Sequence, residues 1–190
     1  MDALKRKILS EGRAQGESIL MVDSFLNHQV DAGLMAEIGR EFQRLTAHLR
    51  PTRVVTIETS GIAPAQMTAL YMNLPLVIFR KAKDVSQSPD VLQIGVRSFT
   101  KNAVYQLTVK AEYIPPGDRV LFIDDFLAAG EAAAGTAQLV ERRGASVVGM
   151  GIVIEKSFQD GRRRLDALGY EVFSLARIAR MRPAIEFLND

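Results

Sequence analysis

The chain has 190 residues, of which 47% are hydrophobic and 24% charged, so it is long enough to bury a substantial core without disulfides or a structural metal. It contains no cysteine, which excludes thiol catalysis, Cys-ligated zinc and a disulfide framework. The formal net charge of +2 argues against generic nucleic-acid binding. The apolar stretches are too short to cross a membrane and the N-terminus has no signal-peptide core, so we expect a cytoplasmic protein.

The periodicity of apolar residues predicts helices and strands that alternate along most of the chain. The first is an amphipathic helix that begins after Asp31, a good N-cap residue. The predicted elements are, in chain order, a helix over 32–49, a strand over 53–58, a helix over 63–72, a strand over 76–79, strands over 92–99 and 104–113 joined by a turn at 100–102, a strand over 119–123, a helix over 131–143, a strand over 146–155, a helix over 162–168 and a strand over 170–175.

Strands that alternate with helices predict crossover connections, and therefore an α/β fold with a doubly wound, mainly parallel sheet flanked by helices. The two strands joined at 100–102 are expected to project from this sheet as a β-hairpin. Ligands of such sheets bind at the carboxyl ends of the strands, where the strand order reverses. This edge is where the sequence directs a search for a functional site.

Two adjacent carboxylates, Asp124 and Asp125, follow the apolar strand at 119–123, and a loop of small residues then leads into a helix. Backbone N–H groups over 128–132 would converge at the start of that helix, which favours an anion such as phosphate. The carboxylates just upstream could accept hydrogen bonds from the hydroxyl groups of a sugar. The alternative is an acidic pair that only ends a strand and caps a helix. Neither a P-loop nor a G-x-G-x-x-G motif is present.

The segment from Val120 to Ala132 resembles the signature of the type I phosphoribosyltransferases, in which a strand, two acids and a small-residue loop bind phosphoribosyl pyrophosphate. The resemblance implies that Asp124 and Asp125 are catalytic. It implies that the loop binds the 5-phosphate through Ala128, Ala129, Gly130, Glu131 and Ala132. Ala129 stands where the family often has Thr and Glu131 where it often has Gly, so the Glu131 carboxylate must be kept from repelling the phosphate.

Further matches extend the resemblance over nearly the whole chain. The segment 57–65 looks like the family's pyrophosphate loop, which places Ser60 and Gly61 at the diphosphate, and Lys81 lies in a basic cluster of the kind that grips it. The resemblance implies one domain over 1–190. In that domain 1–30 and part of 155–190 would form a hood over the base, and about 84–106 would form a flexible loop.

The segments 21–29 and 151–159 are similar to those of family members that act on xanthine, which places Leu20, Asn27 and Lys156 in the purine pocket. An ammonium group only donates hydrogen bonds, so Lys156 would favour a 6-oxo group over the 6-amino group of adenine. Asn27 can donate and accept, and could read the 2-position of the ring. The amide alone does not separate xanthine from guanine.

The resemblance implies an enzyme that joins xanthine to the phosphoribosyl group, with Mg²⁺ carried by the substrate diphosphate and not by protein ligands. It also implies a homodimer without a nucleic-acid or membrane partner. Two alternatives stay open. One is a preference for guanine or hypoxanthine. The other is a non-catalytic regulator that senses phosphoribosyl pyrophosphate and binds nucleic acid, for which the basic triplet 162–164 could form a patch.

Overall fold

The computed structural model describes residues 1–98 and 103–188, and within them the chain forms a large central sheet, a small sheet of β1 and β2, and five α-helices. The elements are, in chain order, α1 (Asp2–Glu11), β1 (Arg13–Gln15), β2 (Ile19–Met21), a π-helical turn (Asp23–Asn27), α2 (Ala32–Thr46), a 3₁₀ turn (Ala47–Leu49), β3 (Arg53–Ile57), α3 (Ile62–Met72), β4 (Leu76–Ala82), β5 (Val91–Ser98), β6 (Ala103–Lys110), a 3₁₀ turn (Ala111–Tyr113), β7 (Arg119–Leu127), α4 (Glu131–Arg142), β8 (Ser146–Lys156), α5 (Gly161–Ala167), β9 (Val172–Arg180) and β10 (Glu186–Phe187).

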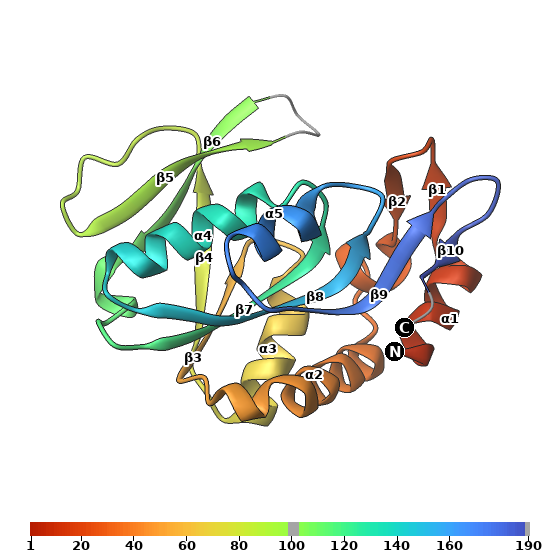
Figure 1. The fold of residues 1–190 in the computed structure, drawn as a ribbon, viewed down its shortest axis with the longest axis horizontal. Helices are drawn as coiled ribbons and strands as arrows, with labels where there is room; N and C mark the ends of the chain where they lie inside the picture. The colour runs from red at the N-terminus through yellow and green to blue at the C-terminus, as the bar shows by residue number, and fades with distance from the viewer. Residues whose placement is uncertain (99–102, 189–190) are drawn as a thin grey trace.

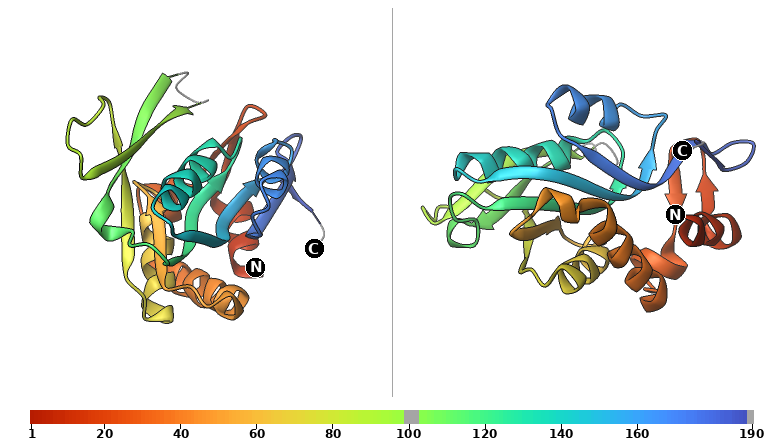
Figure 2. Two further views of the ribbon diagram at one scale, coloured as in Figure 1. Left: turned by 60° about the vertical axis from the view of Figure 1, so that its left-hand side comes forward. Right: turned by 60° about the horizontal axis from the view of Figure 1, so that its bottom comes forward.

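The central sheet has the strand order β10-β9-β8-β7-β3-β4-β6-β5. Strands β9, β8, β7, β3 and β4 run parallel, while β10 at one edge and the β5–β6 hairpin at the other are antiparallel. Helices α2 and α3 cover one face, and α4 and α5 cover the other (Figures 1 and 2). The predicted doubly wound α/β fold is therefore confirmed. The strand order reverses between β3 and β7, which marks their carboxyl ends as the expected place for a ligand.

Alternate residues of the central strands supply two separate cores. On β3, Val54 packs on the α2–α3 side and Val55 on the α4 side, and on β7 Leu121 and Phe122 divide in the same way. Fully burying a side chain of this kind stabilises the fold by roughly 1.5–3 kcal/mol. The near-continuous apolar runs of these strands follow from burial on both faces.

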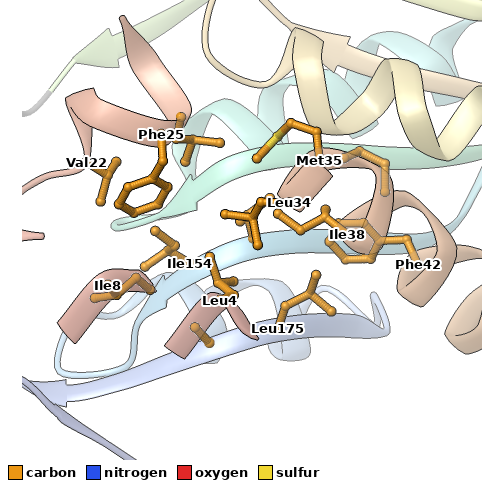
Figure 3. Close-up of a cluster of buried hydrophobic side chains, with 14 of the residues drawn as sticks. Leu4, Ile8, Val22, Phe25, Leu34, Met35, Ile38, Phe42, Ile154 and Leu175 are labelled. Carbon is orange, nitrogen blue, oxygen red and sulfur yellow. The ribbon is translucent and has the colours of Figure 1, made fainter. Parts of the chain in front are cut away.

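The N-terminal segment packs against the far end of the sheet. Leu4 and Ile8 of α1 lie in the same hydrophobic cluster as Ile154 of β8 and Leu175 of β9 (Figure 3). The α-amino group at the chain start donates to the carbonyl oxygen of Leu175 at 2.6 Å, and α1 lies beside the C-terminal strands (Figure 1). The segments 1–30 and 155–188 therefore contact each other at this end of the molecule.

Three strands extend further than the sequence predicts. β7 continues to Leu127 because it pairs with β8 as far as Glu155, so the two aspartates lie within the strand and not after it. β4 likewise runs to Ala82, and β9 begins at Val172 and runs to Arg180. Hydrogen bonding to neighbouring strands keeps these polar ends extended, against local preferences that favour a loop.

The hairpin prediction is confirmed over the described residues, since β5 and β6 pair antiparallel from Val91↔Lys110 onwards. The predicted turn at 100–102 lies outside the described residues. Four elements, α1, β1, β2 and β10, carry no sequence prediction. The three strands have only two or three residues each, too few for a periodic pattern. The ten-residue α1 was missed although Leu4 and Ile8 stand at helical spacing. In the ranges 1–98 and 103–188, none of the helices combines the length and apolar character that a membrane crossing needs.

Candidate active site

A cavity of about 580 Å³ opens at the carboxyl ends of the strands, beside the point where the strand order reverses. A smaller hollow of about 130 Å³ adjoins it and shares Lys81, Asp124 and Ala132 with it. The residues that line the larger cavity are Ser18, Ile19, Lys81, Arg97, Tyr105, Asp124, Phe126, Leu127, Ala128, Ala129, Gly130, Glu131, Ala132, Ala133, Lys156 and Gln159. The smaller hollow is lined also by Ile57, Glu58, Thr59, Ser60 and Asp125. Most of the site residues predicted from the sequence therefore surround one connected space.

The two aspartates stand side by side where β7 borders both spaces. The backbone N–H of Asp125 donates to Asp124 Oδ1 at 3.0 Å. Burial raises the pKa of the Asp124 carboxyl well above its usual range, the neighbouring Asp125 carboxylate raises it further, and the charge of Lys81 opposes the shift. A cation close to this pair would relieve the repulsion between the two carboxylates.

The turn between β3 and α3 approaches the aspartates so closely that only glycine fits. A Cβ atom on Gly61 would lie 2.4 Å from Thr56 Oγ1 and 2.7 Å from Asp124 Oδ1. Ser60 of the same turn lines the smaller hollow, and the Glu58–Thr59 peptide before it is cis. The predicted diphosphate turn thus lies against the catalytic candidates.

The loop 128–132 has the backbone of an anion site. Gly130 takes a left-handed conformation (φ +76°), and α4 begins at the next residue with no side chain of the described chain capping it. The first N–H groups of α4 have no acceptor within the helix, and the residues that carry them line the cavity next to the small Ala128 and Ala129. From outside, Gly161 of α5 donates its N–H to the Ala128 oxygen at 2.9 Å. A Cβ on Gly161 would lie 2.2 Å from that oxygen, so α5 seats closely against the loop.

Glu131, which departs from the family pattern, has a partner of opposite charge. Its Oε1 lies 3.3 Å from Nη1 of Arg164 on α5. The carboxylate that the sequence predicts must be kept from repelling a phosphate is therefore paired with a guanidinium.

Lys81 reaches the site from β4 and is held by its neighbours. Its backbone N–H donates to Glu58 Oε1 at 2.6 Å, and Arg80 donates to the other Glu58 oxygen at 2.8 Å. Burial would raise the pKa of Glu58, but the Arg80 and Lys81 donors hold it below its usual range. The Lys81 ammonium lies 5.6 Å from the ring centre of Tyr105 on the hairpin. Because Lys81 borders both spaces, its charge faces the anion that either would hold.

Lys156 enters the larger cavity from the end of β8. Its Nζ donates to the backbone oxygen of Ser18 at 2.7 Å and lies 5.0 Å from the ring centre of Phe126. Burial lowers the pKa of Lys156, and the charge of Asp125 opposes that shift. One of the three N–H donors is used by Ser18, so the others are available to a ligand.

The other two residues predicted for the purine pocket are placed differently. Leu20 is 5% exposed and packs in the same hydrophobic cluster as Val22. Asn27 has a buried Oδ1 without a hydrogen-bond partner in the described chain. Neither is among the described residues that line the cavity, whereas Ser18 and Ile19 are.

Sequence reasoning missed an aromatic residue of the cavity wall. Phe126 follows Asp124 by two positions on β7, so both point to the same side of the sheet. The sequence would have predicted Phe126 at the cavity if the strand had been extended past Ile123. Tyr105 and Arg97, from the hairpin, gave no such signal, because their approach depends on how β5 and β6 fold over α4.

Each arginine of the basic triplet 162–164 has a carboxylate partner. Arg162 donates to the buried Glu155, Arg163 to Asp160 at 2.8 Å, and Arg164 pairs with Glu131. All three guanidinium charges are therefore met by carboxylates of the same chain, which weakens the nucleic-acid alternative.

Glu155 is 1% exposed and accepts hydrogen bonds from Arg162, Ser157 and Ser174 at 2.6–3.1 Å. Burial alone would raise the pKa of Glu155, but these donors hold it below the usual range. A lowered carboxyl pKa stabilises the fold above the unfolded pKa, and that stability is lost as pH falls through the folded value.

Replacing Arg162 by Met should therefore destabilise the protein by about 3 kcal/mol, because the buried carboxylate loses its hydrogen-bonded cation and keeps the more distant Arg177, whose Nε lies 3.5 Å from Glu155 Oε1. The destabilisation should shrink on acidification, as Glu155 becomes protonated. Urea unfolding at neutral pH and near pH 4 measures both effects, with Arg163→Met on the exposed side of α5 as control. Equal stability of the two variants at neutral pH would contradict the role assigned to this pair.

Comparison with known proteins places this site in a family. The family model described as "Phosphoribosyl transferase domain" matches residues 21–180. The chain is 55% identical over 190 residues to xanthine phosphoribosyltransferase 1 of Clostridium botulinum, covering 100% of both chains. It is 52% identical to xanthine phosphoribosyltransferase of Clostridium acetobutylicum, covering 99% of this chain and 100% of that one.

Among solved structures, the adenine phosphoribosyltransferase from Thermoanaerobacter pseudethanolicus aligns with a TM-score of 0.75 and 23% identity, over 90% of this chain and 98% of that one. This likeness concerns the fold alone. The family match over most of the chain and the full-length relatives agree with the cavity, the paired aspartates and the uncapped helix start. The chain therefore belongs to the phosphoribosyltransferase family.

Proposed function

We propose that the protein transfers the 5-phosphoribosyl group from phosphoribosyl pyrophosphate to xanthine, giving xanthosine 5′-monophosphate and pyrophosphate. The observation that carries this proposal is the placement of Asp124, the loop 128–132 and Lys156 around one cavity. Its full-length relatives at 52–55% identity, named for this activity, support it.

The loop 128–132 would bind the 5-phosphate through its N–H groups, which places the ribose ring over β7. Asp124 and Asp125 would then accept hydrogen bonds from the ribose hydroxyls and oppose the positive charge that develops on the sugar. The bond from the anomeric carbon to the diphosphate oxygen would break with its electron pair leaving on the diphosphate. The bond to the purine nitrogen would form, and the proton of that nitrogen would pass to water or to the departing diphosphate. Catalysis in this scheme is positional and electrostatic.

The leaving diphosphate would lie in the smaller hollow, beside the turn of Ser60 and Gly61 and the ammonium of Lys81. Carboxylate and diphosphate oxygens are the ligands that Mg²⁺ prefers, and the aspartates at this hollow fit an ion carried by the substrate. Mg²⁺ would supply charge neutralisation of the diphosphate there. Asp124 and Asp125 would hold its water ligands.

The purine would occupy the part of the cavity between Ile19, Phe126 and Lys156. The two apolar side chains offer walls for a flat ring, and the free N–H donors of Lys156 offer a partner to its 6-oxo group. Adenine presents a donor at that position, which would leave both groups unpaired. Asn27 could read the 2-position if the hood, formed by 1–30 and part of 155–190, closes over the base.

We further propose a single domain over 1–190, a homodimer, as the resemblance to the family implies, and a cytoplasmic location. The proposed location rests on the substrate. Phosphoribosyl pyrophosphate is too highly charged to cross a membrane, so the enzyme must work in the compartment where this substrate is made. Sedimentation of the purified protein tests the dimer.

The proposed function is tested by measuring pyrophosphate release with four purines, phosphoribosyl pyrophosphate and Mg²⁺. We expect turnover with xanthine to exceed that with guanine and hypoxanthine, and adenine to be the poorest substrate by about 10⁴-fold. A preference for adenine would contradict the role of Lys156. Absence of turnover with every base, together with binding of phosphoribosyl pyrophosphate, would favour the non-catalytic regulator.

A further inference from the structure

Helix α5 supports the phosphate loop from outside the cavity through a charged contact. Arg164 on its exposed side lies 3.3 Å from Glu131, the residue that opens α4 and lines the cavity. The helix is itself fixed at two points. Arg162 donates to the buried Glu155, and the Gly161 N–H donates to the Ala128 oxygen. The guanidinium of Arg164 is therefore presented to the loop from a helix that is hydrogen-bonded both to β8 and to the loop itself.

A carboxylate at the first position of α4 favours the empty helix start but opposes a phosphate there. The charge of Glu131 acts across the cavity, since it contributes, after burial and the charge of Asp124, to raising the pKa of Tyr105 on the hairpin. Glu131 belongs to the loop 128–132 and lines the cavity, so its charge also acts on an anion bound there. Without a compensating cation, the loop would repel the group that it is shaped to bind.

We propose that Arg164 is a positioning residue for phosphate recognition. It holds the Glu131 carboxylate and neutralises it, so that the loop N–H groups can donate hydrogen bonds to a phosphate monoester. The inference rests on the proposed function, which places the 5-phosphate of the substrate at this loop. Glu131 stands where the family often has Gly, and Arg164 on α5 would compensate for the charge that this difference introduces.

The test is a double-mutant cycle at positions 164 and 131, with phosphoribosyl pyrophosphate and ribose 5-phosphate as probes. Arg164→Gln should raise the dissociation constant of both probes, and the KM for phosphoribosyl pyrophosphate, by about five-fold. The KM for xanthine should stay the same. Adding Glu131→Gln to the Arg164→Gln variant should bring the affinity for both probes back to within two-fold of the parent protein, or make it tighter, because the repelling carboxylate is gone. Arg164→Lys should retain most of the affinity.

Arg163→Gln is the matched control, since within the described part of the chain Arg163 pairs only with the exposed Asp160, the N-cap residue of α5. Thermal unfolding of each variant shows whether the fold is kept. An unchanged affinity in Arg164→Gln, or a loss that Glu131→Gln fails to reverse, would overturn the inference while leaving the proposed function in place. A parent protein that binds neither probe would overturn both.

Discussion

Replacing Asp124 and Asp125 together by Asn should reduce turnover at least ~10³-fold while the fold is kept. An amide keeps the size of each side chain but removes the negative charge that opposes the developing cation on the sugar. It also presents an NH₂ group where the ribose hydroxyls need an acceptor. Single-turnover rates with saturating xanthine and phosphoribosyl pyrophosphate measure the chemical step.

We expect the stability of the same variant to change in the opposite direction from its turnover. Because burial raises the pKa of Asp124, the folded state binds a proton more tightly than the unfolded chain. Stability from this group is therefore lost as pH rises from the unfolded pKa through the raised one. At neutral pH the Asn variant should unfold at the same temperature as the parent protein or a higher one.

Asp166→Asn serves as control, because it changes an exposed carboxylate of α5 that does not line the cavity. It should alter neither turnover nor the unfolding temperature. Near-normal turnover of the double Asn variant would remove the catalytic role from the pair. A loss of turnover with an equal loss of folded protein would show that the pair acts on structure.

The second large effect is expected at Lys156. Lys156→Gln should lower kcat/KM for xanthine by about 100-fold, because the 6-oxo group loses a charged donor in a partly buried place. A glutamine amide can also accept, so the 6-amino group of adenine would meet a partner that the lysine cannot give. The ratio of kcat/KM for xanthine to that for adenine should therefore fall further than activity with xanthine alone.

Lys110→Gln is the control for this change. Lys110 lies on β6, its side chain is 64% exposed, and it faces Glu112 away from the cavity. Its loss should leave the purine ratio unchanged. If Lys156→Gln lowers activity with all four purines equally, Lys156 supports the site without reading the base.

The sequence predicts the sheet because its central strands are buried on both faces and lie between periodic helices. It also predicts which residues gather at the site, since parallel strands bring their carboxyl ends to one edge. The end of β7 was the informative exception. Two carboxylates ended the predicted strand at Ile123, but pairing with β8 keeps the backbone extended and places Phe126 on the cavity wall.

Contacts between distant segments could not be predicted in this way. Nothing in the sequence near Glu131 indicates that a guanidinium of α5 meets it. The sequence also leaves open whether Leu20 contributes a side chain to the cavity, because the short strand β2 has no period to show which face is buried. In the structure that side chain belongs to the core, and the neighbouring Ser18 and Ile19 face the cavity instead.

The cluster in Figure 3 has a consequence for the chain as it is made. Ile154 and Leu175 lie on β8 and β9, and the first helix of the chain covers them through Leu4 and Ile8. Until that helix docks, the two strands expose an apolar surface through which partly folded chains can associate. Helix α1, which is remote from the cavity, thus protects the folding chain from aggregation. Substitutions that weaken its packing should reduce the yield of soluble enzyme before they change the catalytic rate.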